Sequence, residues 1–269
     1  MIKRIMVIIA MLALAFSVSA QTLKDGKYFA QDSAFASTGW KDQVVLEIKG
    51  GKISSVNWNG IGNQGLEDKK TVAASGRYGM KKVAKQGEWD VQAKNVEDFL
   101  LKVQDPSKIS LNDKGKTDAI TGASMTVSGF VNLVDKALAA GPVAKGMYSK
   151  DGWFYSSAAD FDSSGWKSNV LATVVNGTVV DIMWNGISKD TKKKSKLVEA
   201  VSGKYGMGKV AKLGEWNVQA EKVQSGLLKV QDPAKIVVNA KGKADAITGV
   251  SITVSDFFTL SAEALGKAK

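Results

Sequence analysis

The chain has 269 residues and a formal net charge of +11, and it contains no cysteine and no histidine. These absences exclude disulfides, thiolate nucleophiles, Cys/His zinc sites, histidine-ligated haem and any Ser-His-Asp triad. The positive charge comes from scattered lysines without an arginine-rich stripe, which indicates a solvated surface and no nucleic-acid partner.

Residues 1–20 have the pattern of a secretory signal peptide. Lys3 and Arg4 precede an apolar run over residues 5–17, and Val18-Ser19-Ala20 supplies small residues for cleavage. The apolar run is shorter than the roughly 20 residues that a membrane-spanning helix needs. We therefore expect export and cleavage, and a mature protein in the periplasm or outside the cell.

The region that follows predicts short antiparallel strands. Asp25-Gly26 is a turn before a first strand, and Lys49-Gly50-Gly51-Lys52 is a hairpin turn between strands at residues 44–48 and 53–58. Further along, Asn176-Gly177 separates two similar β-branched runs. Asn-Gly between such runs is a strong hairpin signal.

Helical patterns come next in the first half. Residues 67–86 mix apolar residues with lysines and predict a helix with a break near Ser75-Gly76. Apolar residues spaced three and four apart over residues 91–103 predict an amphipathic helix that ends at Asp105-Pro106. Residues 109–111 predict another short strand before a turn.

A nine-residue segment then occurs twice. Asp118-Ala-Ile-Thr-Gly-Ala-Ser-Met-Thr126 returns nearly unchanged at residues 245–253, and the first copy leads into a predicted helix at residues 127–140. A period of about 127 residues is too long for a solenoid unit and indicates duplication of a whole domain. We predict an α+β fold of two tandem repeats, each a small antiparallel sheet packed with helices. Their expected ranges are residues 21–141 and 142–269.

Glycine and hydroxyl residues before a helix form a place to hold a phosphate group, because backbone N–H groups and the positive helix end favour an anion. The alternative for the motif serines is a plain helix N-cap, a position that serine favours. Both interpretations stay open on the residues alone.

The repeated motif, the upstream Asp25-Gly26-Lys27-Tyr28 and the Gly-Lys-Ile hairpin resemble the extracytoplasmic FMN-binding domain family. That family includes the flavin subunits of sodium-translocating quinone reductases and Rnf-type complexes. The resemblance covers both repeats and implies FMN as cofactor, joined by a phosphoester that a flavin transferase installs. The acceptor hydroxyls it implies are Ser124 and Ser251.

The resemblance also implies which loop residues surround FMN. They are Asp118, Thr121, Gly122, Ala123 and Thr126 in the first half, and Asp245, Thr248, Gly249 and Thr253 in the second. The chain departs from the family in two ways. Serine replaces the usual threonine at both acceptor positions, and Val250 replaces the alanine of the second motif, so the first half is the expected site if only one is loaded.

Two Tyr-Gly-Met segments supply candidate contacts for the flavin ring, namely Tyr78 and Met80 with Tyr205 and Met207. Aromatic and thioether groups suit a flat, polarisable ligand. The alternative is ordinary core packing shared by the two repeats.

These features predict an exported flavoprotein that transfers electrons, with a redox partner in or at the membrane. Because the chain has no histidine for acid–base work, we expect a carrier more than a stand-alone enzyme, and assign no catalytic residue and no metal ligand. The alternative is a non-catalytic flavin-binding or surface interaction module with degenerate flavin sites. An enzyme that reduces a small acceptor is the least supported reading. The sequence leaves the oligomeric state open.

Overall fold

The structure is a computed structural model that describes residues 23–269, so the signal peptide predicted at residues 1–20 lies outside the described residues. It contains two three-stranded antiparallel sheets, one in each half. The strands are β1 Gly26–Gln31, β2 Trp40–Lys49, β3 Lys52–Gly62, β4 Gly152–Ser157, β5 Trp166–Val175 and β6 Thr178–Ser188. The middle strand of each sheet is the second in chain order. The predicted α+β class with two similar halves is confirmed.

Tight hairpins join the two longest strands of each sheet. Gly50 and Gly51 have φ of 58° and 72°, and Asn176 and Gly177 have φ of 52° and 74°. Two successive residues with positive φ give the turn whose twist matches that of the flanking strands, and glycine and asparagine tolerate this conformation. Both predicted hairpins are therefore confirmed.

Helices cover one face of each sheet. They are α1 Lys69–Ala74, α2 Trp89–Val103, α3 Ser128–Ala140, α4 Lys196–Val201, α5 Trp216–Val230 and α6 Ser255–Gly266. In the first half α3 packs on β1 and β2 while α2 packs on β3, and α6 and α5 repeat this arrangement on the second sheet. Alternate residues of β2, among them Val44, Leu46 and Ile48, are buried beneath these helices. The buried side chains of the strands, which alternate along each strand, thus pack against the apolar faces of the helices and form one core in each half.

The repeated Lys-Val-Gln-Asp-Pro segments end α2 and α5. Gln104 adopts the left-handed conformation with φ of 63°. Its side-chain Oε1 accepts from Ile53 N at 2.8 Å while its Nε2 donates to Ile53 O at 2.9 Å. Gln231 makes the same pair of bonds to Val179 at 2.7 and 3.0 Å. Each glutamine therefore fastens the end of its helix to the sheet beneath it.

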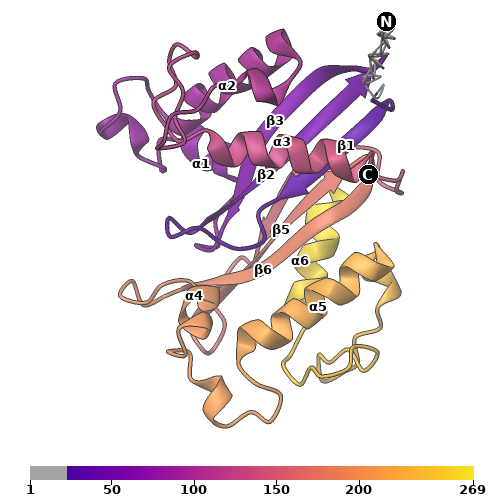
Figure 1. Ribbon diagram of the computed structural model, residues 1–269. Helices are drawn as coiled ribbons and strands as arrows, with labels where there is room; N and C mark the ends of the chain where they lie inside the picture. The colour runs from indigo at the N-terminus through magenta and orange to yellow at the C-terminus, as the bar shows by residue number, and fades with distance from the viewer. Residues whose placement is uncertain (1–22) are drawn as a thin grey trace, which may run out of the picture.

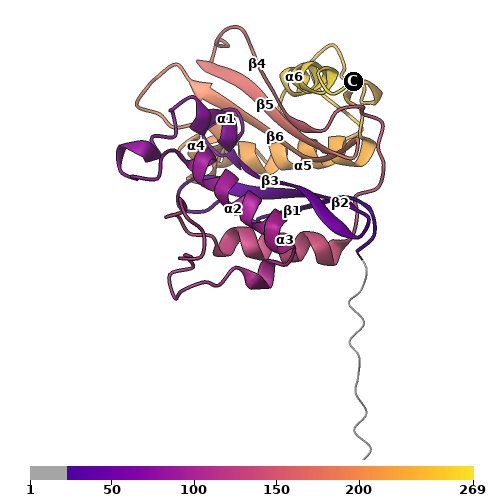
Figure 2. The same cartoon turned by 90° about the horizontal axis from the view of Figure 1, so that it is seen from above.

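The two sheets pack against each other through the faces that the helices leave bare, so the molecule has helices on both outer sides (Figures 1 and 2). Gln43 lies fully buried in this contact. Its Nε2 donates to Asp181 Oδ2 at 3.0 Å, and its Oε1 accepts from Trp153 Nε1 at 2.6 Å and Thr173 Oγ1 at 3.1 Å. Ile61, Leu171 and Met183 form a small apolar cluster in the same layer. The halves are thus joined by a mixed polar and apolar interface.

Two sequence predictions are wrong. Only residues 69–74 of the predicted helix at 67–86 are α-helical, followed by the short 3-10 helix η1 Met80–Lys82. The predicted break near Ser75-Gly76 is confirmed, since Ser75 is the C-cap of α1 and Gly76 has a positive φ. The α-helix does not resume after it, because Gly79 also has a positive φ, and Val83 is 90% exposed. Residues 109–111 form no strand because no partner strand lies beside them. None of the helices within residues 23–269 has the length and apolar character to cross a bilayer.

Candidate functional site

The two copies of the repeated motif form loops, here called the first motif loop (residues 118–126) and the second motif loop (residues 245–253). The first leads into α3, but its hydroxyls do not cap that helix. Val127 is the N-cap, and the backbone N–H groups of Val127 and Ser128 donate to Gly115 O at 2.7 and 3.0 Å. The alternative interpretation of Ser124 as a plain helix N-cap is therefore wrong.

Ser124 is held by a residue that the sequence reading missed. Its backbone N and its Oγ both donate to Gln92 Oε1, at 2.8 and 3.2 Å. Gln92 lies on α2, is fully buried, and donates from Nε2 to Gly87 O at 3.2 Å and toward Met80 Sδ at 3.8 Å. Since Ser124 itself is only half-buried, the arrangement orients a hydroxyl that solvent and ligands can still reach.

The second half repeats this contact. Ser251 N and Oγ donate to Gln219 Oε1 at 2.7 and 3.2 Å, and Gln219 Nε2 donates to Gly214 O at 3.2 Å. The sequence carried a signal for it, because Trp-x-Val-Gln-Ala occurs at residues 89–93 and again at 216–220. A buried glutamine retained at the same place in both halves has a polar partner to satisfy.

The positive φ of the motif glycines favours glycine at both positions, and each glycine lies close to a side chain of the neighbouring long helix. Gly122 has φ of 81°, and a Cβ there would lie 2.6 Å from Asn95 Nδ2, which donates to Gly122 O at 3.2 Å. Gly249 has φ of 77°, and its Cβ would lie 2.6 Å from Lys222 Nζ, which donates to Gly249 O at 3.2 Å. The second motif loop thus carries a cation where the first carries a neutral amide.

The other residues predicted for the loops lie around these serines. Thr121, Thr126 and Asp118 are exposed in the first loop, as are Thr248, Thr253 and Asp245 in the second. In the second loop Lys243 Nζ donates to Ser251 O at 2.5 Å and to Thr253 Oγ1 at 3.3 Å. Exposed hydroxyls, a glycine turn and a nearby ammonium group are the donors that a phosphate ester needs. The residues present therefore fit the phosphate end of FMN.

The tyrosine and the methionine predicted to contact the flavin in the first half have different surroundings. The Tyr78 ring packs 5.9 Å from that of Trp40 and 6.3 Å from that of Trp89. Lys69 Nζ lies 4.1 Å from the centre of the Trp89 ring and bonds Asp42 Oδ1 at 2.8 Å. Burial lowers the pKa of Lys69, and the Asp42 carboxylate opposes that shift. Tyr78 is therefore part of an aromatic cage around a buried lysine, whereas Met80 reaches the Gln92 that holds Ser124.

The second half builds the same cage without the carboxylate. Lys196 Nζ lies 5.3 Å from the Tyr205 ring centre and 5.0 Å from that of Trp216. Ser168 stands where the first half has Asp42, since each is paired with a glycine of the neighbouring strand. Burial lowers the pKa of Lys196 as well. Met207, the counterpart of Met80, packs against the second core.

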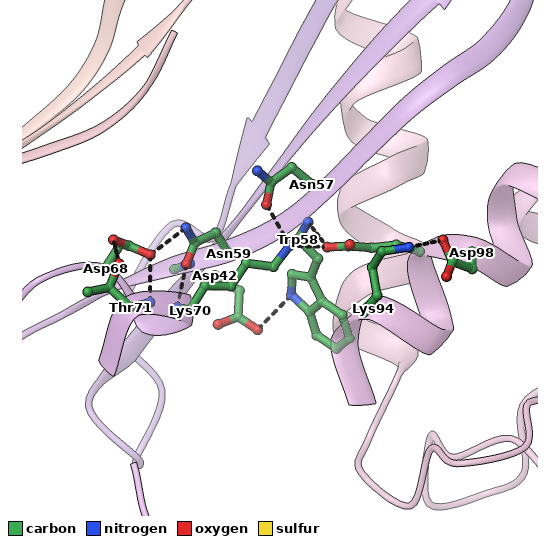
Figure 3. A network of polar contacts seen from close by, with 11 residues as sticks. Asp42, Asn57, Trp58, Asn59, Asp68, Lys70, Thr71, Lys94 and Asp98 are labelled. Atoms are coloured by element: carbon green, nitrogen blue, oxygen red, sulfur yellow. Dashed lines mark hydrogen bonds and ion pairs between the residues drawn. The ribbon is translucent and has the colours of Figure 1, made fainter. Parts of the chain in front are cut away.

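A polar network fixes α2, and with it Gln92, to the sheet (Figure 3). Buried Glu97 accepts from Trp58 N and from Lys70 Nζ, both at 2.6 Å, and Lys70 Nζ also donates to Asn57 Oδ1 at 2.9 Å. Burial raises the pKa of Glu97 even though the Lys70 ammonium favours its ionised form. In the second half Gln224 Oε1 takes the same place and accepts from Trp184 N at 2.5 Å. The network orients the helix that presents Gln92.

Fold and site together define an α+β domain that presents a half-buried serine hydroxyl on a glycine-containing loop. The sequence model of the FMN-binding domain family matches residues 39–139, within the first half and including the first motif loop. The first half of the chain therefore contains a domain of this family, and FMN is its cofactor.

Two solved structures are similar to part of the chain. A solution NMR structure of a Clostridium thermocellum protein is 43% identical, covers 44% of this chain and 92% of its own length, and has a TM-score of 0.36. A crystal structure of a Clostridium perfringens protein is 20% identical, covers 45% of this chain and 89% of its own, and has a TM-score of 0.34. The comparison with curated proteins gave no match.

Proposed function

We propose that this chain is an exported electron-transfer flavoprotein in which FMN is attached covalently through Ser124. The observation that carries the proposal is the pair of hydrogen bonds from Ser124 N and Oγ to the buried Gln92 Oε1, because they fix an accessible hydroxyl within the matched domain. Thr121 and Thr126 lie on the same exposed loop and supply further donors for a phosphate.

Ser251 is the proposed acceptor in the second half. It makes the same two bonds, to Gln219, and Lys222 and Lys243 bring ammonium groups to its loop. Val250 adds bulk beside the serine relative to Ala123. We therefore expect Ser251 to be loaded less completely than Ser124.

FMN, when bound, accepts and returns one or two electrons, so the chain itself has to hold the flavin and expose it to partners. With no histidine in the chain, proton transfer to a substrate has no obvious side chain to perform it. A carrier between a donor in or at the membrane and an acceptor outside the cytoplasm fits these residues better than a substrate reductase. A flavin transferase is the partner that installs the cofactor.

The test is the intact mass and visible absorbance of the mature protein purified from its native host. Flavin that stays with the protein after denaturation, together with a start near residue 21, is the expected result. Release of the flavin on denaturation would indicate a non-covalent flavin-binding protein. A colourless protein would indicate a surface interaction module. Either outcome refutes covalent attachment.

A further inference from the structure

A groove runs along α5 beside the second motif loop. It has a volume of about 640 Å³. Its floor and walls include Val218, Ile236 and Ile247, and its edges carry Glu221, Lys222 and Lys229. Small-molecule sites usually enclose about 300–1,000 Å³, with apolar walls and few polar groups. The groove has that size and that mixture of residues.

One of the residues that line the groove differs in size between the halves. Position 226 of α5 is glycine, whereas the equivalent position of α2 is Phe99, which is partly buried against the first core. Ile247 lies against Gly226, where an added Cβ would be 3.0 Å from Ile247 Cδ1, and it is only partly covered, whereas its counterpart Ile120 in the first half is 5% exposed. Glycine in the interior of a helix lowers helix stability, so its presence here is not explained by helix formation.

A positively charged side chain lies at the end of the groove nearest the second motif loop. Lys222 lines it and also donates to Gly249 O at 3.2 Å, so its ammonium group lies where the groove meets the second motif loop. Lys229 adds a second ammonium on the same helix, and Glu221 is the one acidic group among the lining residues. In the first half Asn95, without charge, replaces Lys222. An anionic group is therefore favoured at the loop end and an apolar ring against Gly226.

We infer that this groove is a non-covalent binding site for a flat, apolar ring compound that carries a negative charge, and that the first half lacks this site because Phe99 fills it. FMN belongs to that chemical class, and so do other aromatic anions. The inference concerns the groove alone and does not depend on covalent attachment at Ser124 or Ser251.

The test uses the full mature chain produced in a host without flavin transferase, so that neither serine is modified. Anilinonaphthalene sulfonate, an aromatic ring compound with one negative charge, is titrated by its fluorescence. Gly226→Phe should weaken its binding by at least about tenfold, as expected when a large side chain fills an apolar pocket. Lys222→Asn, which copies Asn95, should weaken it about two- to fivefold through loss of an exposed charge.

The matched variant is Phe99→Gly, which should add a second binding site of similar affinity in the first half. Circular dichroism confirms that each variant is folded, and Gly226→Leu replaces Gly226→Phe if the larger residue does not fold. Competition by FMN indicates that the groove takes flavin, whereas its failure to compete points to another aromatic anion. Binding that is unchanged in Gly226→Phe and Gly226→Leu, or a Phe99→Gly variant that gains no site, overturns the inference.

Discussion

Gln92 and Ser124 are 32 residues apart in sequence, yet one oxygen of the Gln92 side chain accepts both the backbone N–H and the hydroxyl of Ser124. The glutamine belongs to a helix and the serine to a loop, so these hydrogen bonds fix the position of the first motif loop relative to α2. Gln219 and Ser251 repeat the relationship in the second half. A polar side chain is buried in each half for this contact, and its removal leaves the loop without its anchor.

The first prediction concerns the acceptor hydroxyl. Ser124→Ala should abolish denaturation-resistant flavin in the first half, because the phosphoester has no other oxygen at that position. Ser124→Thr should keep or improve loading, since it retains the nucleophile. Peptide mass mapping after co-expression with a flavin transferase measures both, and Ser251→Ala serves as the matched control that leaves the first half loaded. An unmodified peptide spanning Ser124 in wild-type protein from the native host contradicts the assignment.

The second prediction separates the two caged lysines. Lys69→Met leaves the Asp42 carboxylate, whose side chain is 18% exposed, without its ammonium partner, and should destabilise the protein by about 2 kcal/mol. Lys196→Met should change stability by less than about 1 kcal/mol, because Ser168 replaces Asp42 there, so the change removes the contact with the rings and the weaker attraction of Asp162 and Asp256 but no direct ion pair like that of Lys69. Urea unfolding of both variants measures the difference. Equal losses are inconsistent with a role for the Asp42 ion pair.

Local sequence patterns were sufficient for the hairpins and the long helices. Asn176-Gly177 and the apolar spacing within α2 are signals that lie in short segments, and the structure confirms both. In the segment at 67–86 the break near Ser75-Gly76 was predicted, but the continuation beyond it failed, since Gly79 takes a positive φ that no helix continues through. Composition alone did not reveal that conformation.

The parts of the site that escaped prediction depend on contacts between distant segments. In the sequence Gln92 stood out only because a glutamine recurs at position 219. Its partner Ser124 lies 32 residues further along the chain. Gln43 has partners more than 100 residues away in the second sheet, and a single sequence carries no indication of such pairing. The packing of sheet on sheet was not predicted for the same reason.

The third prediction tests that interface between the sheets. Gln43→Ala leaves Trp153 and Thr173 without this partner in a buried layer and removes one of the partners of Asp181, so it should cost about 3 kcal/mol of unfolding free energy. The matched control is Asn169→Ala at the equivalent strand position. Within residues 23–269 the Nδ2 of Asn169 has no hydrogen-bond partner, so that change should cost about 1 kcal/mol or less. A larger loss from Asn169→Ala reverses the expected order and rejects this account.

The fourth prediction is that residues 21–141 fold without the second half. Their core, which includes Phe130, Leu46 and Leu100, lies between the first sheet and its own helices. The isolated fragment should melt cooperatively, at a lower temperature than the full chain because Gln43 and Ile61 lose the second sheet. Differential scanning calorimetry measures this. A fragment that stays unfolded until residues 142–269 are added shows that the halves form a single folding unit.

The last prediction concerns Glu97, whose pKa burial raises above the ordinary value of 4.5. A carboxyl group with a raised pKa in the folded state binds its proton more tightly there than in the unfolded chain. Its contribution to stability is therefore fully present below about pH 4.5 and is lost as the pH rises through the folded-state pKa. Ionised Glu97 is only partly compensated by Lys70, whose side chain is 27% exposed.

Glu97→Gln copies Gln224, which accepts the equivalent backbone N–H of Trp184 in the second half. The variant keeps the hydrogen bond to Trp58 N and removes the buried charge. It should therefore match wild type at pH 7 or exceed it by about 1 kcal/mol, and its advantage should shrink as the pH falls toward 4.5. Urea unfolding at a series of pH values gives both curves. Because Gln224 already lacks the charge, Gln224→Glu should introduce a loss of stability with rising pH in the second half that is at least as large, since Leu197 stands where the first half has Lys70. An advantage of Glu97→Gln that grows on acidification, or a Gln224→Glu variant with no added pH dependence, contradicts this interpretation.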